Sequence, residues 1–108
     1  REKIERCLEA ARLAPSTSNS QPWRFVVVDE PQLRGRLADR TRGPLGSFNT
    51  FTPQAPVLVA VVTDAPNLEA RAGALLKRRD FRLIDIGIAA VQFCLQATEL
   101  GLGLEVEL

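Results

Sequence analysis

Hydroxyl and amide side chains fill one short stretch of the sequence, residues 16–21, and proline follows at position 22. A predicted helix precedes this stretch and a predicted strand follows it. A polar loop held between two buried elements can present several hydrogen-bond donors and acceptors from a rigid frame, which is how binding sites are commonly built. On composition alone, a capping turn is an equally good interpretation.

The sequence contains no histidine. This absence excludes a Ser-His-Asp triad, a His-ligated metal and a histidine general base. The acids near the C-terminal end show neither the pairing expected for general acid/base catalysis nor the spacing of a metal site; they are Asp85, Glu99, Glu105 and Glu107. No catalytic residue is identified in this way, and we expect a cofactor rather than a metal to supply the chemistry.

The 108 residues carry a net charge of +1, and 45% of them are hydrophobic, which is the composition of one ordinary globular domain. This charge balance argues against nucleic-acid binding, which usually needs a strongly basic face. No apolar run approaches the about 20 residues of a membrane helix, and the first residues do not resemble a secretory signal. Cys7 and Cys94 make no disulfide framework and fit buried helix faces. We therefore expect a cytoplasmic protein that binds neither nucleic acid nor membrane.

Hydrophobic periodicity and turn residues divide the sequence into helices and strands. The sequence predicts helices at 4–14, 31–41, 68–79 and 81–100, strands at 23–28, 57–62 and 104–108, and a long loop at 41–53. The strand at 57–62 is a continuous apolar run, which is typical of a strand covered on both faces. The helix at 81–100 is apolar on nearly every side, so we expect it to be buried almost all round, with close backbone packing at Gly87.

Positive charge is concentrated between residues 32 and 82, where nine basic residues stand against four acidic ones. A basic segment of this kind can attract an anionic ligand. A solvated helical face is the favoured alternative.

Residues 14–23 read Ala-Pro-Ser-Thr-Ser-Asn-Ser-Gln-Pro-Trp, between an apolar helix and a β-branched strand. This segment strongly resembles the flavin loop of the FMN-dependent nitroreductase family. Two further segments are similar to that family and follow in the same order. One is Asn49 ahead of the strand that begins with Ala55-Pro56, and the other is the long helix that ends in Gly101-Leu102-Gly103.

The resemblance implies an α+β fold, in which helices pack on a small, mainly antiparallel sheet. It also implies a homodimer in which the flavin loop reaches FMN across the interface, with the long helix in the dimer core. Residues 1–108 would form one nitroreductase-like FMN-binding domain that is incomplete at both ends. By similarity, the residues that contact FMN or shape the contact are Pro15, Ser16, Thr17, Ser18, Asn19 and Gln21, with Asn49 near the pyrimidine edge of the ring.

The implied reaction is a two-electron transfer from NADH or NADPH, through FMN, to a nitroaromatic, quinone or similar small acceptor. Two alternatives remain open: a dehalogenase or flavin-modifying enzyme of the same family, and a non-catalytic relic or dimerisation module. The family's usual phosphate-binding elements are not recognised in this sequence. Four arginines are candidates to replace them, and the sequence does not choose among Arg24, Arg78, Arg79 and Arg82.

Overall fold

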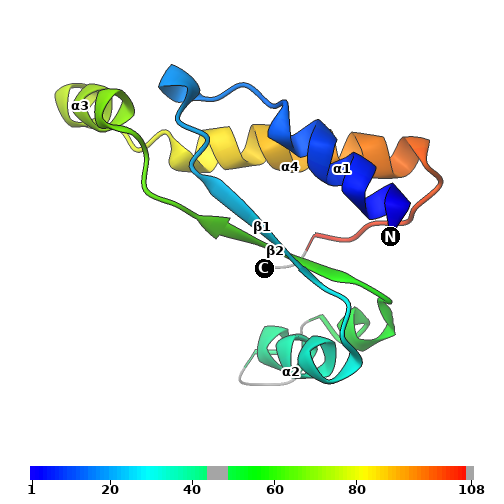
Figure 1. Ribbon diagram of the computed structural model, residues 1–108. Helices are drawn as coiled ribbons and strands as arrows, with labels where there is room; N and C mark the ends of the chain where they lie inside the picture. Colours follow the sequence, from blue (N-terminus) through cyan, green and yellow to red (C-terminus); the bar gives the residue numbers. More distant parts are fainter. Residues whose placement is uncertain (44–48, 107–108) are drawn as a thin grey trace. The chain divides into compact units, whose positions relative to one another are not determined.

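The computed structural model describes residues 1–43 and 49–106 of the chain. Four helices and two strands follow one another, with two short 3-10 helices between them (Figure 1). In chain order the elements are α1 (Glu2–Arg12), η1 (Thr17–Asn19), β1 (Trp23–Val28), α2 (Pro31–Thr41), η2 (Thr52–Gln54), β2 (Leu58–Thr63), α3 (Leu68–Lys77) and α4 (Arg82–Glu99). The predicted α+β fold is confirmed, and four helices and two strands lie close to their predicted positions.

The residues divide into two compact units, each of which is described by itself. Unit 1 comprises Arg1–Arg24 and Val61–Leu104, and unit 2 comprises Phe25–Ala60 and Glu105–Leu108. Unit 1 contains α1, η1, α3 and α4, whereas unit 2 contains α2 and η2.

The core of unit 1 lies between α1 and α4, which run side by side in blue and in yellow to orange in Figure 1. Cys7 and Ala11 of α1 are buried, and α4 contributes small buried residues that let the two backbones approach closely. The apolar residues that α4 buries are Ala89, Phe93 and Ala97. These residues follow one another at intervals of four, which places them on one helical face.

The remaining faces of α4 are more exposed than the sequence predicts. The prediction that this helix is buried almost all round is wrong, because Leu83, Ile84, Val91 and Leu95 are between 50% and 74% exposed. Gly87 is exposed as well, and a Cβ atom built there would meet no heavy atom within 4 Å, so it makes no close backbone contact. The described residues cover α4 on one side and leave the other side uncovered, which apolar composition alone did not reveal.

The two strands form an antiparallel ribbon. The Asp64 N–H donates to the Pro22 carbonyl oxygen at 3.0 Å, which joins the end of β2 to the start of β1. The expectation that β2 is covered on both faces is wrong, because Val61 and Val62 are exposed. The physical reason is the width of the sheet: among the described residues it has two strands, too few to bury both faces of either one.

In unit 2, α2 begins where the sequence predicts, because its first turn is capped. The Glu30 carboxylate accepts hydrogen bonds from the N–H groups of Gln32 and Leu33, and Pro31 occupies the first helical turn. These two backbone hydrogen bonds lower the pKa of Glu30. The cap thus keeps Glu30 ionised and fixes the point at which β1 turns into α2.

Several predicted features lie at the edges of the described structure. Residues 104–106 form no strand, contrary to the prediction for 104–108, and residues 107–108 lie outside the described residues. Residues 44–48 of the predicted loop at 41–53 also lie outside them. Gly101 ends α4 in the left-handed conformation, at φ 75°, as the sequence predicts. Within 1–43 and 49–106, no helix is both long and apolar enough to cross a membrane.

Candidate functional site

The polar loop after α1 has an uncommon backbone. Ser18, Asn19 and Gln21 all adopt positive φ angles, of 50°, 50° and 49°. Residues other than glycine pay a steric cost in this left-handed region, and such residues concentrate at ligand sites and turns where the surroundings enforce the conformation. The loop is therefore a shape that the rest of unit 1 must hold in place.

One restraint comes from a buried carboxylate on α4. Asp85 is 3% exposed, and its Oδ1 atom accepts hydrogen bonds from both the N–H and the hydroxyl of Thr17, each at 3.0 Å. Asp85 lies in the first turn of α4, where the helix dipole favours negative charge. Burying a charge is costly unless it is hydrogen-bonded, so Asp85 and Thr17 stabilise each other across 68 residues of sequence.

A second restraint comes from the residue that caps α3. The Asn67 side chain accepts from the Ala70 N–H at 2.9 Å through Oδ1, as an N-cap residue does. Its Nδ2 group donates to the Ser18 carbonyl oxygen at 2.9 Å, and its backbone N–H donates to the Ser20 hydroxyl oxygen at 2.8 Å. Asn67 therefore starts α3 and holds the middle of the loop at once.

The loop also closes on itself. The Ser16 hydroxyl oxygen accepts from the Gln21 N–H at 2.9 Å, and the Asn19 N–H donates to the Ser16 carbonyl oxygen at 3.0 Å. Pro22, the next residue, is buried. These contacts use backbone groups and leave the exposed side chains of Ser18, Asn19 and Gln21 without hydrogen bonds to any described residue. One hydroxyl and two amides are thus available to a ligand.

The structure brings most of the predicted site residues together. Those that lie in this one loop of unit 1 are Pro15, Ser16, Thr17, Ser18, Asn19 and Gln21. The hydroxyl of Thr17 is already donated to Asp85, so any ligand contact of Thr17 must use other atoms. Their role in binding FMN stays a prediction.

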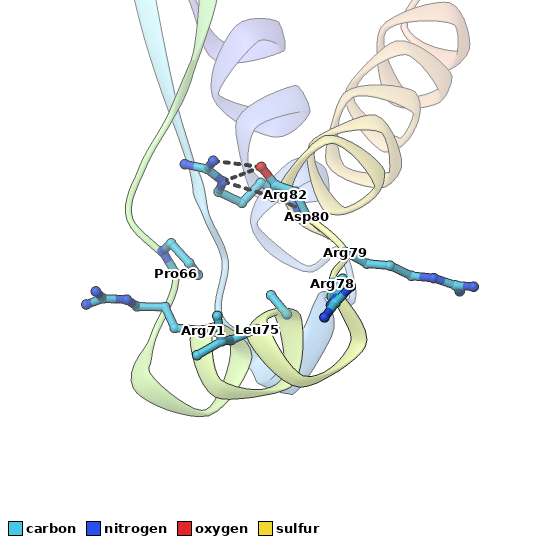
Figure 2. A pocket seen from close by; sticks show the side chains of 8 residues that line it. Pro66, Arg71, Leu75, Arg78, Arg79, Asp80 and Arg82 are labelled. Atoms are coloured by element: carbon cyan, nitrogen blue, oxygen red, sulfur yellow. Dashed lines mark hydrogen bonds and ion pairs between the residues drawn. The ribbon is translucent and has the colours of Figure 1, made fainter.

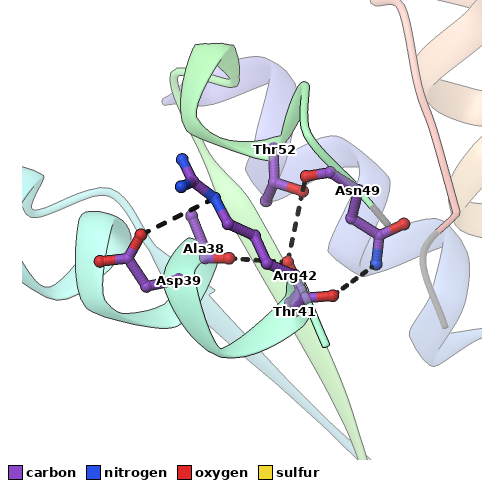
Figure 3. Close-up of polar contacts among 6 residues, drawn as sticks. All are labelled: Ala38, Asp39, Thr41, Arg42, Asn49 and Thr52. Carbon is purple, nitrogen blue, oxygen red and sulfur yellow. Dashed lines mark hydrogen bonds and ion pairs between the residues drawn. The ribbon is translucent and has the colours of Figure 1, made fainter. Parts of the chain in front are cut away.

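Asn49, the remaining predicted site residue, lies in unit 2 (Figure 3). It is half-buried at φ 51°, and its Nδ2 group donates to the Thr41 carbonyl oxygen at 3.0 Å. Its own carbonyl oxygen accepts from the Thr52 hydroxyl at 2.8 Å. These contacts tie the segment after residue 48 to α2, while the Asn49 Oδ1 atom makes no hydrogen bond to the described residues.

Neither residue that holds the loop was predicted from the sequence. Asp85 was considered only as one of the unpaired acids near the C-terminal end, and Asn67 was not singled out. The available signals were an acid in the first turn of a helix and an asparagine directly before one, which indicate helix starts. Neither signal shows which distant segment the side chain contacts, because that depends on tertiary packing.

The structure also shows the surroundings of Cys7 and of two arginine candidates, Arg24 and Arg82. Cys7 is fully buried, and burial raises the pKa of its thiol, as expected of an inert core residue. Arg24 pairs with Asp64 at 2.9 Å and Arg82 with Asp80 at 2.7 Å. No cluster of possible metal ligands occurs within the described ranges.

Comparison with known proteins gives related sequences. The nitroreductase family model matches residues 1–46. A protein of Bacillus subtilis (strain 168) named "Putative NAD(P)H nitroreductase YdgI" is 40% identical over 70 residues, which are 64% of this chain and 31% of that protein. The 5,6-dimethylbenzimidazole synthase of Rhodospirillum rubrum is 37% identical over 103 residues, which are 95% of this chain and 42% of that protein. The chain spans less than half the length of these two curated relatives.

Comparison with solved structures concerns the fold. An FMN-dependent nitroreductase from Clostridium difficile R20291 is 30% identical with a TM-score of 0.71, over 94% of this chain and 50% of that one. A BluB-like flavoprotein from Clostridium difficile 630 is 28% identical with a TM-score of 0.73, over 93% of this chain and 61% of that one. The fold is thus that of nitroreductases, as the resemblance implied.

Replacing Asp85 tests whether the buried carboxylate holds the loop. We expect Asp85→Ala to lower the free energy of unfolding by about 2 to 3 kcal/mol, because two donors on Thr17 lose a charged acceptor. Asp85→Asn keeps an Oδ1 acceptor and should lose less than half of that. Urea denaturation measures both, with Glu99→Ala as the control, since Glu99 is an exposed acid of α4 whose side chain makes no hydrogen bond or ion pair with a described residue. An Asp85→Ala protein as stable as the unmodified one would contradict this assignment.

Proposed function

Because the chain belongs to the nitroreductase family, we propose that it is part of an FMN-dependent oxidoreductase. The polar loop forms part of the proposed flavin site. The chemistry that bound FMN supplies is two-electron transfer, with hydride taken from NADH or NADPH and the electrons passed to a nitroaromatic, quinone or similar small acceptor. The names of two similar proteins support this, since one includes FMN and the other NAD(P)H.

The observation that carries the proposal is the preformed loop with its exposed amides. Asn19 and Gln21 each offer side-chain N–H donors and a carbonyl acceptor from one restrained segment. The pyrimidine edge of a flavin ring presents the complementary set, with carbonyl oxygens beside an N–H group. The residues present therefore fit the ring of FMN chemically.

The task of the protein in this proposal is binding and orientation. Uncharged donors of the loop would bind the ring carbonyl oxygens, and they would favour the negative charge that the ring gains on reduction. Asp85 and Asn67 hold the loop before the ligand binds. The loop therefore loses less conformational entropy on binding. Asn49 is proposed to add its Oδ1 atom near the pyrimidine edge, and no side chain is proposed as a proton donor.

A flavin titration tests the proposal directly. We expect the protein to bind added FMN with a shift of the flavin absorption band, and NADH or NADPH to bleach that band until an acceptor restores it. Asn19→Ala should weaken binding about tenfold, because an amide that pairs with a ring carbonyl is lost. Thr63→Ala, an exposed change on β2, is the control. A folded protein that takes up no FMN would rule the proposal out.

The relationship to 5,6-dimethylbenzimidazole synthase, which extends over 95% of this chain, supports a second candidate. In that case the protein is a flavin-modifying enzyme of the same family. Repeated cycles of reduction and re-oxidation in air separate the two functions. An acceptor-reducing enzyme regains its full flavin band after every cycle, whereas a flavin-modifying enzyme loses the band permanently.

We also propose that the protein is a homodimer formed through the exposed side of α4. Ile84, Gly87, Val91 and Leu95 follow one another at helical spacing along that side, with open space above Gly87. A continuous apolar helix face that is exposed to water is typical of a protein–protein interaction site. A second α4 can cover it, and Gly87 would allow the two backbones to approach closely.

Analytical ultracentrifugation tests the homodimer. We expect the unmodified protein to sediment as a dimer and Val91→Glu to sediment as a monomer, because the carboxylate would be buried in the interface. Leu75→Glu, on the exposed side of α3, is the matched control and should remain dimeric. A monomeric unmodified protein at micromolar concentration would refute the proposed interface.

A further inference from the structure

Three leucines of α3 in unit 1 are almost fully exposed. Leu68, Leu75 and Leu76 are 81%, 82% and 85% exposed, so the described residues leave them uncovered. Leu68, Ala72 and Leu75 follow one another at intervals of four and three, which places them in one stripe along the helix. Leu76, four residues after Ala72, widens this stripe. An apolar helix face that is exposed to water is typical of an interaction site, because burying it removes apolar surface from water.

Basic side chains border the leucine stripe. The segment 68–79 contains four basic residues and one acidic residue, Glu69. The basic residues are Arg71, Lys77, Arg78 and Arg79. All four are exposed, and none of them forms an ion pair with a carboxylate of residues 1–43 or 49–106. The exposed side of α3 is therefore an apolar surface with a positive border, and the positive charge of that border remains available.

The surface is hollowed at the end of α3, where a shallow pocket of about 470 Å³ has both apolar and basic lining residues (Figure 2). Leu75 of the stripe lines this pocket together with Arg71 and Arg79. The carboxylate of Asp80 does not neutralise these two arginines, because it is paired with Arg82 at 2.7 Å. In Figure 2 the guanidinium groups of Arg71 and Arg79 extend outward on opposite sides. Exposed side chains exchange rotamers in picoseconds to nanoseconds, so both can turn toward a bound carboxylate.

The charge and the shape of this surface distinguish among possible partners. A second copy of α3 would bring like charges together, since each copy carries four basic residues and one acidic residue between 68 and 79, and like charges repel. A lipid surface would leave the hollow at the end of α3 unfilled. An acidic helix of another protein offers leucines or similar side chains to the stripe, carboxylates to the border and a side chain to the hollow.

We propose that the exposed side of α3 binds an acidic amphipathic helix of another protein. The apolar side chains of that helix pack along Leu68, Ala72 and Leu75, because helices pack through residues at this spacing. Its carboxylates pair with the basic border through charge-assisted hydrogen bonds, and one of them enters the pocket beside Arg71. This binding surface does not depend on the proposed flavin site, and it lies on a different helix from the proposed homodimer interface of α4.

A synthetic peptide tests the proposal. The probe is a fluorescent helical peptide of about 15 residues, with leucine along one face and glutamate at the flanking positions, and fluorescence anisotropy follows its binding to the unmodified protein. We expect saturable binding that weakens at high salt, because salt screens the ion pairs of the border. Two matched peptides should each bind about tenfold more weakly. One has lysine in place of glutamate, and the other has alanine in place of leucine.

Substitutions on α3 test the location of the binding surface. Leu75→Ala should weaken binding of the acidic peptide about tenfold through faster dissociation, because apolar contact is lost. Arg71→Ala should weaken binding through slower association, and it should reduce the dependence on salt. Both side chains are exposed, so we expect thermal unfolding of the two variants to match that of the unmodified protein. The controls on α2 are Leu33→Ala and Arg36→Ala, which remove an exposed leucine and an exposed arginine from another helix.

The proposal is overturned if the acidic peptide does not bind, or if the α2 controls weaken its binding as much as the α3 variants do. It is also overturned if another occupant covers the leucines. Phosphatidylglycerol vesicles that bind the unmodified protein but not Leu75→Ala would identify a lipid surface as that occupant. A dimer that Leu75→Glu converts into a monomer in sedimentation would identify a second copy of the chain.

Discussion

A single buried carboxylate fixes the arrangement on which the site depends. Asp85 enters the apolar interface of α4 with its charge satisfied by two donors of Thr17 and by the helix N-terminus. Its loss would leave those donors without an acceptor inside unit 1. Because α4 is also held by packing against α1, the loop inherits the rigidity of the helical core. The polar segment that connects α1 to β1 is thus anchored to the core at Thr17, while Ser18, Asn19 and Gln21 stay exposed.

This anchoring explains how three residues can hold left-handed backbone conformations without glycine. Asn67 adds a second attachment from α3, and Ser16 closes the segment from within. Together the contacts engage several backbone groups of the loop and leave the exposed side chains of Ser18, Asn19 and Gln21 free for other partners. Uncharged donors and acceptors held on a restrained backbone are what the proposed flavin site requires.

Local sequence signals predicted much of the fold, since each depends on neighbouring residues. Pro15 and the hydroxyl-amide run marked the loop, the β-branched run marked β1, and Glu30-Pro31 marked the start of α2. What could not be predicted depends on partners distant in sequence: the tie between Asp85 and Thr17, the reach of Asn67, and the exposed side of α4. Apolar residues such as Leu95 indicate that a helix face is suited to burial. They do not indicate whether the same chain or another chain covers that face. Six of the seven residues that the resemblance assigned to the flavin site lie in one loop of unit 1, whereas Asn49 lies in unit 2.

The central claim is that the loop is formed before any ligand binds, through the buried carboxylate of Asp85. Amide hydrogen exchange of Thr17 in the flavin-free protein tests it most directly, because that N–H donates to Asp85. We predict that the Thr17 amide exchanges slowly, with protection comparable to that of the amides near Phe93 in the middle of α4. Exchange of the Thr17 amide at the rate of an unstructured peptide, while α4 remains protected, would contradict the account.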